Sequence, residues 1–200
     1  MLEDSIKKYL ESSISPERFI HSVNVGDTAK RLAMLYGGDI AKAGIAGLVH
    51  DCARELERTQ LLSCIEKEGI AADKLTLEVK ELMHGPAAVH ICRKVFGIED
   101  EEILNAVRYH TTGRENMSLL EKIIYLSDFI EPSRSFDGVE ELRKLAGEDL
   151  DKSLLLAFNS SIEYIISKNG LIHMDTVLSR NFILNRIIQA KLNIDSNSKK

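Results

Sequence analysis

The chain has 200 residues, of which 44% are hydrophobic and 28% charged, and its formal net charge is −5. These values favour one globular domain with a full hydrophobic core, and they exclude a nucleic-acid surface held by a diffuse basic field. Three cysteines without a C-x-x-C spacing argue against a disulfide framework and suit a reducing cytoplasm. No run of about 18 apolar residues and no signal-peptide pattern is present, so we expect no membrane partner.

Apolar residues recur with helical spacing along most of the chain, and no stretch alternates with period two for long enough to form a strand. Helix starts are marked by Ser15 before Pro16 and by a capping box of Ser118 and Glu121. We therefore predict one all-α domain, a helical bundle over residues 1–192, followed by a flexible tail at 193–200. The predicted helices cover residues 2–11, 16–36, 40–51, 59–67, 86–96, 101–110, 119–131, 139–145, 150–167 and 175–192.

The dipeptide His50-Asp51 ends a predicted helix that is built from small and apolar residues. Taken alone, such a pair is an ordinary helix terminus with two polar residues. However, His21 falls on the apolar side of an earlier helix, and Asp128 lies among apolar residues of a later one. An unpaired carboxylate there would be costly to bury, so a metal ion or an arginine must neutralise it.

Four residues can together offer one divalent ion two neutral nitrogens and two carboxylates. They are His21, His50, Asp51 and Asp128. This donor set suits iron, manganese or zinc, and because it lacks a thiolate it indicates a catalytic rather than a structural site. His84 and His110 either bind a second ion bridged by Asp51 or contact phosphate directly, so the number of ions, one or two, stays open.

Longer motifs surround these residues. They are Arg18-Phe19-Ile20-His21-Ser22, Gly47-Leu48-Val49-His50-Asp51, His84-Gly85-Pro86, His110-Thr111-Thr112-Gly113, Ser127-Asp128-Phe129-Ile130-Glu131-Pro132 with Arg134, and Leu171-Ile172-His173 with Thr176. With this set the chain resembles the bacterial YqeK family of HD-domain phosphohydrolases, which split diadenosine tetraphosphate symmetrically into two ADP. The resemblance runs from Arg18 to about Asn181 and implies a single HD-domain helical bundle that holds a divalent metal, usually iron.

The resemblance also implies a role for each matched residue. The implied metal ligands are His21, His50, Asp51 and Asp128, and the implied catalytic residues are Asp51, His84 and His110. The implied substrate contacts are Arg18, His84, His110, Arg134, Leu171, Ile172, His173 and Thr176. Arg18 lies one helical turn before His21, so both can face one phosphate. His84 stands at a predicted helix start, where free N–H groups favour an anion.

Other polar residues receive no role in the site. Arg54, Glu55 and residues 99–102 are expected on solvated faces, and His90 on the surface or behind the site. Arg114 follows His110 in a loop and is a weaker candidate for a substrate contact. The apolar side of the last helix suits either the core or a homodimer face.

Two rival functions share the same residues. One is an HD-type nucleotidase acting on nucleoside mono- or diphosphates, and the other is a metal- and nucleotide-binding module without turnover. An intact ligand set speaks against the second, because buried ligands without an ion would be costly. The implied partner is a small nucleotide that leaves an ADP- or GDP-like product, and these residues do not decide between the two bases.

Overall fold

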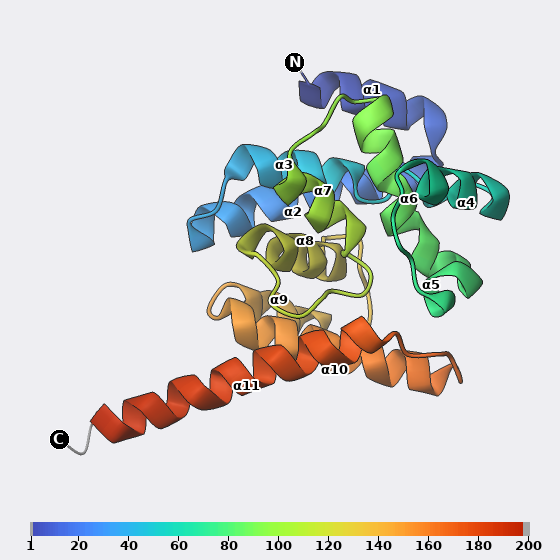
Figure 1. The fold of residues 1–200 in the computed structure, drawn as a ribbon. Coiled ribbons are helices and arrows are strands. Elements are labelled where there is room, and N and C mark those ends of the chain that lie inside the picture. Colours follow the sequence, from blue (N-terminus) through green and yellow to red (C-terminus); the bar gives the residue numbers. More distant parts are fainter. Residues whose placement is uncertain (1, 198–200) are drawn as a thin grey trace.

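A computed structural model describes residues 2–197, and the regular secondary structure within these residues is entirely α-helical (Figure 1). The predicted all-α fold is confirmed. The helices are α1 (Leu2–Ser13), α2 (Pro16–Tyr36), α3 (Ile40–Val49), α4 (Arg58–Lys67), α5 (Lys74–Glu78), α6 (Lys80–Lys94), α7 (Glu101–Arg108), α8 (Leu119–Ile130), α9 (Val139–Ala146), α10 (Leu150–Ser167) and α11 (Met174–Asn197).

The local capping signals of the sequence are present in the structure. Ser15 caps α2 by accepting a hydrogen bond from the backbone N–H of Arg18, and Pro16 occupies the first helical turn. Ser118 and Glu121 form the predicted capping box of α8, in which each side chain accepts from the backbone N–H of the other residue. Caps depend on residues three apart, so they can be predicted from the sequence without knowledge of the tertiary structure.

The prediction for α6 was wrong. The helix begins at Lys80 rather than at Pro86, so Pro86 lies inside it and His84 is not at a helix start. Proline removes one helical hydrogen bond, but every residue from Met83 to Val89 is buried and the packing holds the turn in place. Proline is typical of the first helical turn, so Pro86 indicated a start that is six residues too late.

Two further bounds differ from the prediction. Residues 74–78, expected to be an irregular polar stretch, form the short helix α5, which Asp73 caps through the backbone N–H of Thr76. The last helix continues through Asn197, so residues 193–197 belong to α11 rather than to the expected tail. The remainder of that tail, residues 198–200, lies outside the described residues.

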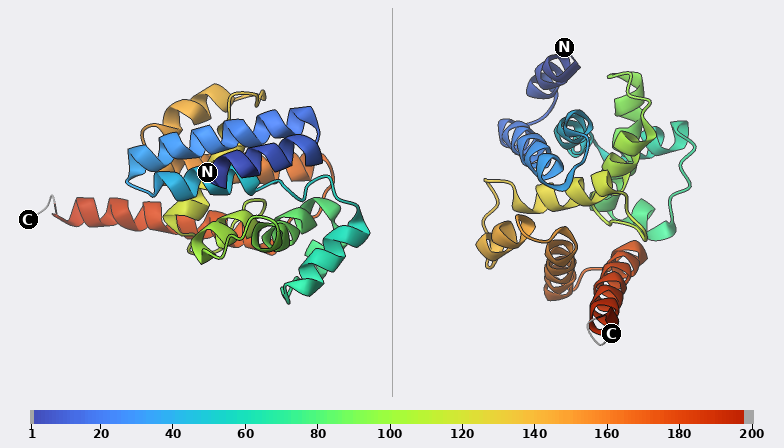
Figure 2. Two further views of the ribbon diagram at one scale, coloured as in Figure 1. Left: turned by 90° about the horizontal axis from the view of Figure 1, so that it is seen from above. Right: turned by 90° about the vertical axis from the view of Figure 1, so that its left-hand side faces the viewer.

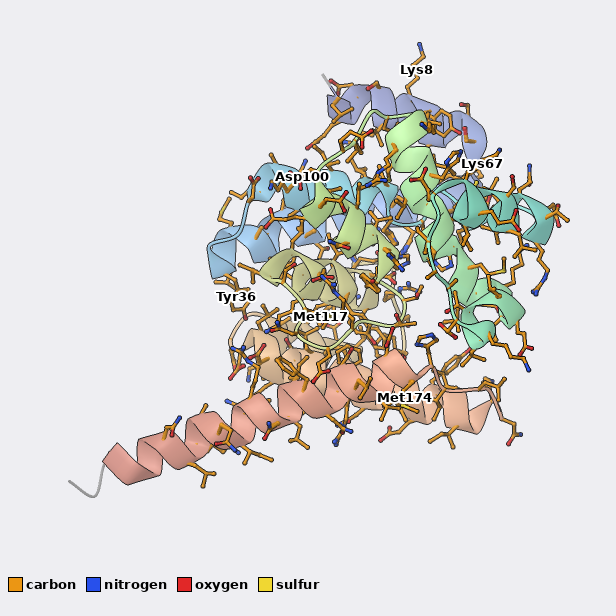
Figure 3. All side chains as sticks on the ribbon, viewed as in Figure 1. Lys8, Tyr36, Lys67, Asp100, Met117 and Met174 are labelled. Carbon is orange, nitrogen blue, oxygen red and sulfur yellow. The ribbon has the colours of Figure 1, made fainter. Side chains whose placement is uncertain are left out.

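Helix α8 lies at the centre of the molecule and packs against α2, α3, α7, α9 and α10 (Figures 1 and 2). All residues from Leu120 to Ser127 are buried, which explains why α8 reads as strongly apolar in the sequence. Side chains such as Lys8 point away from the body at its periphery (Figure 3). The central helix therefore carries Asp128 into contact with the elements that bear the other candidate ligands.

Helices α2 and α3 cross at very short range. A Cβ atom on Gly47 would lie 2.7 Å from the Cα atom of Gly26 and 2.8 Å from its nitrogen, so the two backbones touch there. Because α2 carries His21 and α3 ends at His50, this contact brings the two imidazoles together. Position 47 requires glycine for this approach, whereas a Cβ on Gly26 would lie 3.2 Å from its nearest neighbours.

The last two helices form a pair, and the outer part of α11 extends away from the other helices (Figures 1 and 2). On α11, Ile183 is buried in the core whereas Ile188 is 44% exposed. Within residues 2–197, no helix combines the length and the apolar character that crossing a membrane requires.

Replacing Gly47 with alanine should separate α2 from α3. The added methyl group meets backbone atoms that cannot rotate away, so we expect the free energy of unfolding to fall by about 1–3 kcal/mol. Denaturant unfolding measures the change, and metal binding should weaken in parallel. Gly147→Ala is the matched control, because its φ is −84° and its Cβ would lie 3.3 Å from the nearest atom. Equal effects of the two substitutions would contradict the prediction.

Candidate metal centre

Helices α2, α3 and α8 bring the four predicted ligands together. The Nε2 atom of His21 lies 3.3 Å from Nε2 of His50 and 3.1 Å from Oδ1 of Asp128. The Oδ2 atom of Asp51 lies 3.5 Å from Nε2 of His50 and 3.6 Å from Nε2 of His21. Donor atoms bound to one ion at about 2.1 Å lie about 3 Å apart, so this spacing is that of a ligand set around a common centre.

The hydrogen bonds of two imidazoles leave their Nε2 atoms free to bind a metal. His21 Nδ1 lies 3.1 Å from Oε1 of Glu131, and His50 Nδ1 lies 2.7 Å from the carbonyl oxygen of Gly47. Both oxygens are acceptors, so each Nδ1 carries a proton, and a metal ion would bind the remaining nitrogen, Nε2, of each ring once that atom is unprotonated. The donor set therefore fits a divalent cation.

Glu131 is a part of the site that the sequence analysis missed, because it was named there only within a longer motif. Its side chain is fully buried, and it accepts hydrogen bonds from Asn24 Nδ2 at 3.0 Å and from the backbone N–H of Ser133 at 2.7 Å. Burial would raise the pKa of Glu131, but the hydrogen bonds from Ser133 and His21 hold that pKa below its usual value. A signal was present, since Glu131 follows Asp128 by three positions and lies on its side of the helix.

His84 from α6 and His110 after α7 approach the other oxygen of Asp51. His84 Nε2 lies 3.0 Å and His110 Nε2 3.6 Å from Oδ1 of Asp51, and the two nitrogens are 2.9 Å apart. All three side chains are buried. The two carboxylate oxygens of Asp51 thus face two different pairs of histidines.

The electrostatics of the cluster favour a bound cation. Burial would raise the pKa of Asp51, but its close contacts with His50, His110 and His84 hold that pKa well below its usual range. Burial likewise opposes the ionisation of Asp128, and its contacts with His21 and His50 lower its pKa strongly. Burial lowers the pKa of His84 to about 4, so this ring is neutral at pH 7. Two ionised carboxylates among buried imidazoles match the charge of one divalent ion.

The two arginines expected to contact phosphate lie at the edge of this cluster. Arg18 Nη1 donates to Oδ2 of Asp51 at 2.7 Å. Arg134 donates through Nη2 to Oδ1 of Asp128 at 2.5 Å and through Nε to the Asp128 carbonyl oxygen at 2.8 Å. Both guanidinium groups are partly exposed, so they border the cluster on its solvent side.

The expectation of a solvated Arg54 was wrong. Arg54 is half-buried, and its Nη1 lies 3.0 Å from Nδ1 of His84 and 3.4 Å from the carbonyl oxygen of Glu81. Its neighbour Glu55 is exposed and accepts hydrogen bonds from the backbone N–H and the hydroxyl of Ser15. The packing of the turn after α3 against α6 decides the two contacts of Arg54.

The remaining polar candidates lie outside the cluster. His90 Nδ1 contacts the carboxylate of Glu68 at 2.7 Å. Arg114 donates to Glu121 and covers the ring of Tyr109, so its guanidinium already has partners. Residues 99–102 form ion pairs on the surface with Lys42 and Arg93.

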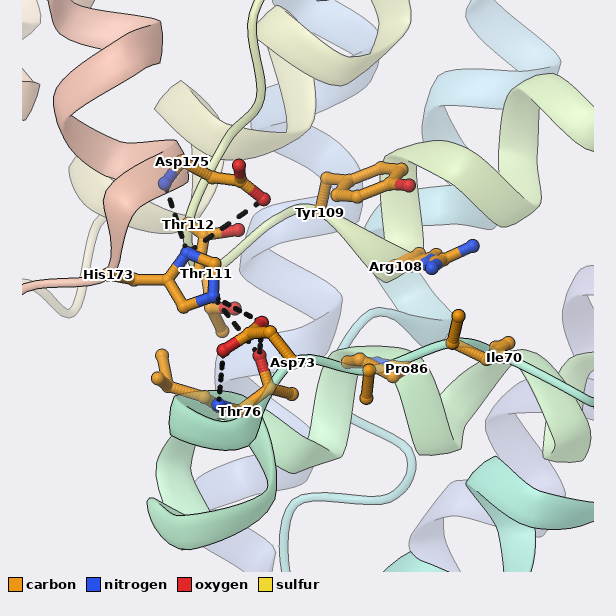
Figure 4. Close-up of a pocket in the computed structure, with 13 residues that line it drawn as sticks. Ile70, Asp73, Thr76, Pro86, Arg108, Tyr109, Thr111, Thr112, His173 and Asp175 are labelled. Carbon is orange, nitrogen blue, oxygen red and sulfur yellow. Dashed lines mark hydrogen bonds and ion pairs between the residues drawn. The ribbon is translucent and has the colours of Figure 1, made fainter.

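A cavity of about 220 Å³ is lined by residues that are close in sequence to His84 and His110 (Figure 4). Its walls include Pro86, two residues after His84, and Tyr109 and Thr111, which flank His110. His173 forms another wall. The segments that carry His84 and His110 therefore also supply walls of this cavity.

His173 is fixed by hydrogen bonds on both ring nitrogens (Figure 4). Its Nδ1 accepts from the backbone N–H of Asp175 at 3.1 Å, and its Nε2 donates to Oδ2 of Asp73 at 2.8 Å. The Asp73 side chain is 53% exposed, and the hydrogen bonds from Thr76 and His173 lower its pKa strongly against a partial loss of solvation. The ring is thus held rigidly in the cavity wall.

The other expected contacts of this loop do not line the cavity. Leu171 is 65% exposed and Ile172 is half-buried. Thr176 is buried, and its backbone N–H donates to the carbonyl oxygen of His173 at 3.1 Å. Thr176 therefore supports the loop rather than the cavity surface.

Comparison with known proteins identifies the family. The HD-domain model matches residues 18–133, more than half of the chain. The chain is 38% identical to the symmetrical bis(5'-nucleosyl)-tetraphosphatase of Bacillus subtilis (strain 168), with 88% of this chain and 94% of that protein covered. It is 40% identical to the enzyme of the same name from Halalkalibacterium halodurans, with 86% and 91% covered. The chain belongs to this HD-domain family.

A solved structure has the same fold. A crystal structure described as a predicted HD superfamily hydrolase involved in NAD metabolism, from Clostridium acetobutylicum, matches with a TM-score of 0.88 and 48% identity. The match covers 92% of this chain and 97% of that one. The matched family region contains His21, His50, Asp51 and Asp128, whereas His173 lies beyond it.

Glu131→Gln should weaken metal binding by about 10- to 100-fold, because an amide oxygen is a weaker acceptor for His21 Nδ1–H than a carboxylate, so it orients the ring less firmly and makes Nε2 less basic. Titration with zinc or iron under anaerobic conditions measures the affinity. The matched control is Glu68→Gln, which alters a histidine–glutamate pair with His90 away from the cluster. An unchanged affinity in Glu131→Gln would show that the contact has no influence on the ligand.

Proposed function

We propose that this protein is a metal-dependent hydrolase that cleaves diadenosine tetraphosphate symmetrically into two ADP. The decisive observation is the preformed donor set on α2, α3 and α8 in a chain whose relatives over most of its length are symmetrical tetraphosphatases. The ligands in this proposal are His21, His50, Asp51 and Asp128.

Iron is the ion that we assign in this proposal, with manganese and zinc as alternatives. Nitrogen and carboxylate donors without a thiolate support any of the three. A divalent ion at this place supplies a Lewis acid that makes water nucleophilic near neutral pH. The protein's own contribution is to hold the phosphates and to balance the charge that develops on them.

Four side chains are placed for that task. Arg18 and Arg134 border the ligand carboxylates from the solvent side, where their guanidinium groups can pair with phosphoryl oxygens. His84 and His110 line the opposite side of Asp51. Phosphates entering between these two sides would meet hydrogen-bond donors from both.

The cavity beside His110 suits the nucleoside end of the substrate. Tyr109 offers an aromatic ring and His173 a fixed imidazole, while Ile70 and Pro86 add apolar surface. A nucleoside held there would sit at a fixed distance from the metal cluster, which is the requirement for symmetric cleavage. Thr176 would act on the substrate through His173, and direct contacts of Leu171 and Ile172 stay predictions.

Three free thiols, two of them buried, support the proposal of a cytoplasmic protein, because such thiols persist in a reducing compartment. The homodimer stays a prediction. On the helix that suggested it, Ile183 faces the core and Ile188 faces solvent.

Product analysis tests the function. Purified protein with diadenosine tetraphosphate should yield two ADP, and AMP plus ATP would reject the symmetric mechanism. Faster turnover of nucleoside mono- or diphosphates in a parallel panel would favour the nucleotidase. His50→Ala should abolish both metal content and turnover, whereas His90→Ala, which alters a histidine outside the cluster, should retain them.

Loss of the His173–Asp73 contact should weaken substrate binding more than chemistry. Asp73→Asn removes the charge that fixes the ring, so we expect KM to rise by about 10-fold with kcat nearly unchanged. Steady-state kinetics with diadenosine tetraphosphate provides both constants. The matched control is Asp149→Asn, which changes another helix-capping aspartate far along the chain. A fall in kcat at constant KM would place His173 in the chemistry instead.

A further inference from the structure

The four histidines of the centre differ in what faces their Nδ1 atoms. For three of them the partner is an oxygen that accepts, including the carbonyl oxygen of Val107 at 2.7 Å from His110 Nδ1. For His84 the partner is Arg54, whose Nη1 lies 3.0 Å away. This one difference changes the chemistry of the His84 ring.

An arginine side chain can only donate hydrogen bonds, so Nδ1 of His84 must be the acceptor in this contact. A doubly protonated ring is excluded as well, because its Nδ1–H would point at the guanidinium group. The neutral ring that accepts at Nδ1 carries its proton on Nε2. His84 therefore presents an N–H group to the centre, where the other three histidines present a lone pair.

The surroundings of His84 Nε2 agree with this assignment. It lies 3.0 Å from Oδ1 of Asp51 and 2.9 Å from Nε2 of His110. Because His110 holds its own proton on Nδ1, its Nε2 is an acceptor, as is the carboxylate. A proton on His84 Nε2 gives the two neighbouring acceptors, His110 Nε2 and Asp51 Oδ1, a hydrogen-bond donor. A nitrogen that carries a proton cannot bind a metal ion.

Arg54 is itself held in place. It lies three residues after Asp51 in the turn that follows α3, and its backbone N–H donates to the carbonyl oxygen of Asp51 at 2.9 Å. Its guanidinium also reaches the carbonyl oxygen of Glu81 on α6, three residues before His84. The same turn thus positions a metal ligand and the residue that determines the tautomer of His84.

We propose that Arg54 is a positioning residue that fixes His84 as an Nε2–H donor, so that His84 donates to a substrate phosphate instead of binding a second metal ion. The part concerning substrate depends on the proposed function, whereas the tautomer and the metal count do not. Asp51, His84 and His110 would otherwise form a second ligand group, since their donor atoms lie close together.

The wild-type protein tests the tautomer directly. Zinc-loaded protein labelled with ¹⁵N-histidine should show His84 with an unprotonated Nδ1 and a protonated Nε2, the reverse of the other three rings. Metal analysis should find one zinc ion per chain at saturation. A proton on His84 Nδ1, or two tightly bound ions per chain, would overturn the proposal.

Substitutions of Arg54 test whether this residue sets the tautomer of His84. In Arg54→Glu the new carboxylate accepts from Nδ1–H and frees Nε2, so bound zinc should rise from one to two ions per chain. Arg54→Gln should also raise the number of bound zinc ions, and it replaces Arg54→Glu in the test if that variant does not fold. Arg54→Lys keeps a donor and should retain one ion. The matched control is Arg58→Gln, which removes an arginine that donates only to the carbonyl oxygens of Leu77 and Glu78.

Kinetics with diadenosine tetraphosphate complete the test. Arg54→Glu and Arg54→Gln should lose about 10- to 100-fold in kcat/KM, with Arg54→Lys recovering part of it and Arg58→Gln near wild type. One ion in folded Arg54→Glu and Arg54→Gln, with Nε2 still protonated, would overturn the proposal. If the ion counts follow expectation but no variant or wild type hydrolyses the substrate, the proposed function fails and the role of Arg54 in setting the tautomer stands.

Discussion

The buried carboxylate of Asp51 contacts more of the site than any other group described above. Its Oδ2 atom faces Arg18, His21 and His50, and its Oδ1 atom faces His84 and His110. A carboxylate in such surroundings would be very costly to bury without these partners. The helices that carry them must therefore converge on one point, and this requirement governs the arrangement of α2, α3, α6, α7 and α8.

Convergence of this kind needs unusually close packing at a few positions. The glycine contact between α2 and α3 lets two backbones touch, and Gly85 does the same where α6 meets the end of α7, since a Cβ there would lie 2.7 Å from the carbonyl oxygen of Arg108. Gly47 lies three residues before His50, and Gly85 directly follows His84. Small residues are thus placed where the site needs short distances between helices.

The two carboxylate oxygens of Asp51 face histidines with different hydrogen-bonding states. On the side of His21 and His50, hydrogen bonds to Glu131 and Gly47 leave lone pairs directed at a cation. On the other side, Arg54 gives His84 the opposite polarity. The cavity proposed for the nucleoside is lined by Pro86 and Tyr109, which are close in sequence to His84 and His110, so in that proposal the substrate would lie on the side of the hydrogen-bond donors. Residues behind the ligands determine this polarity as much as the ligands themselves do.

The sequence by itself determined the all-α class, most helix starts and the identity of the candidate ligands, because caps and apolar periodicity act over a few residues and the motif side chains have a restricted chemistry. It did not determine the start of α6, since Pro86 lies inside the helix although proline usually marks a first helical turn. Nor did it reveal the partners of His84 and His21, which lie 30 and 110 residues away in the chain. Only the tertiary structure brings Arg54 and Glu131 to these rings, because contacts between distant segments depend on how whole helices pack.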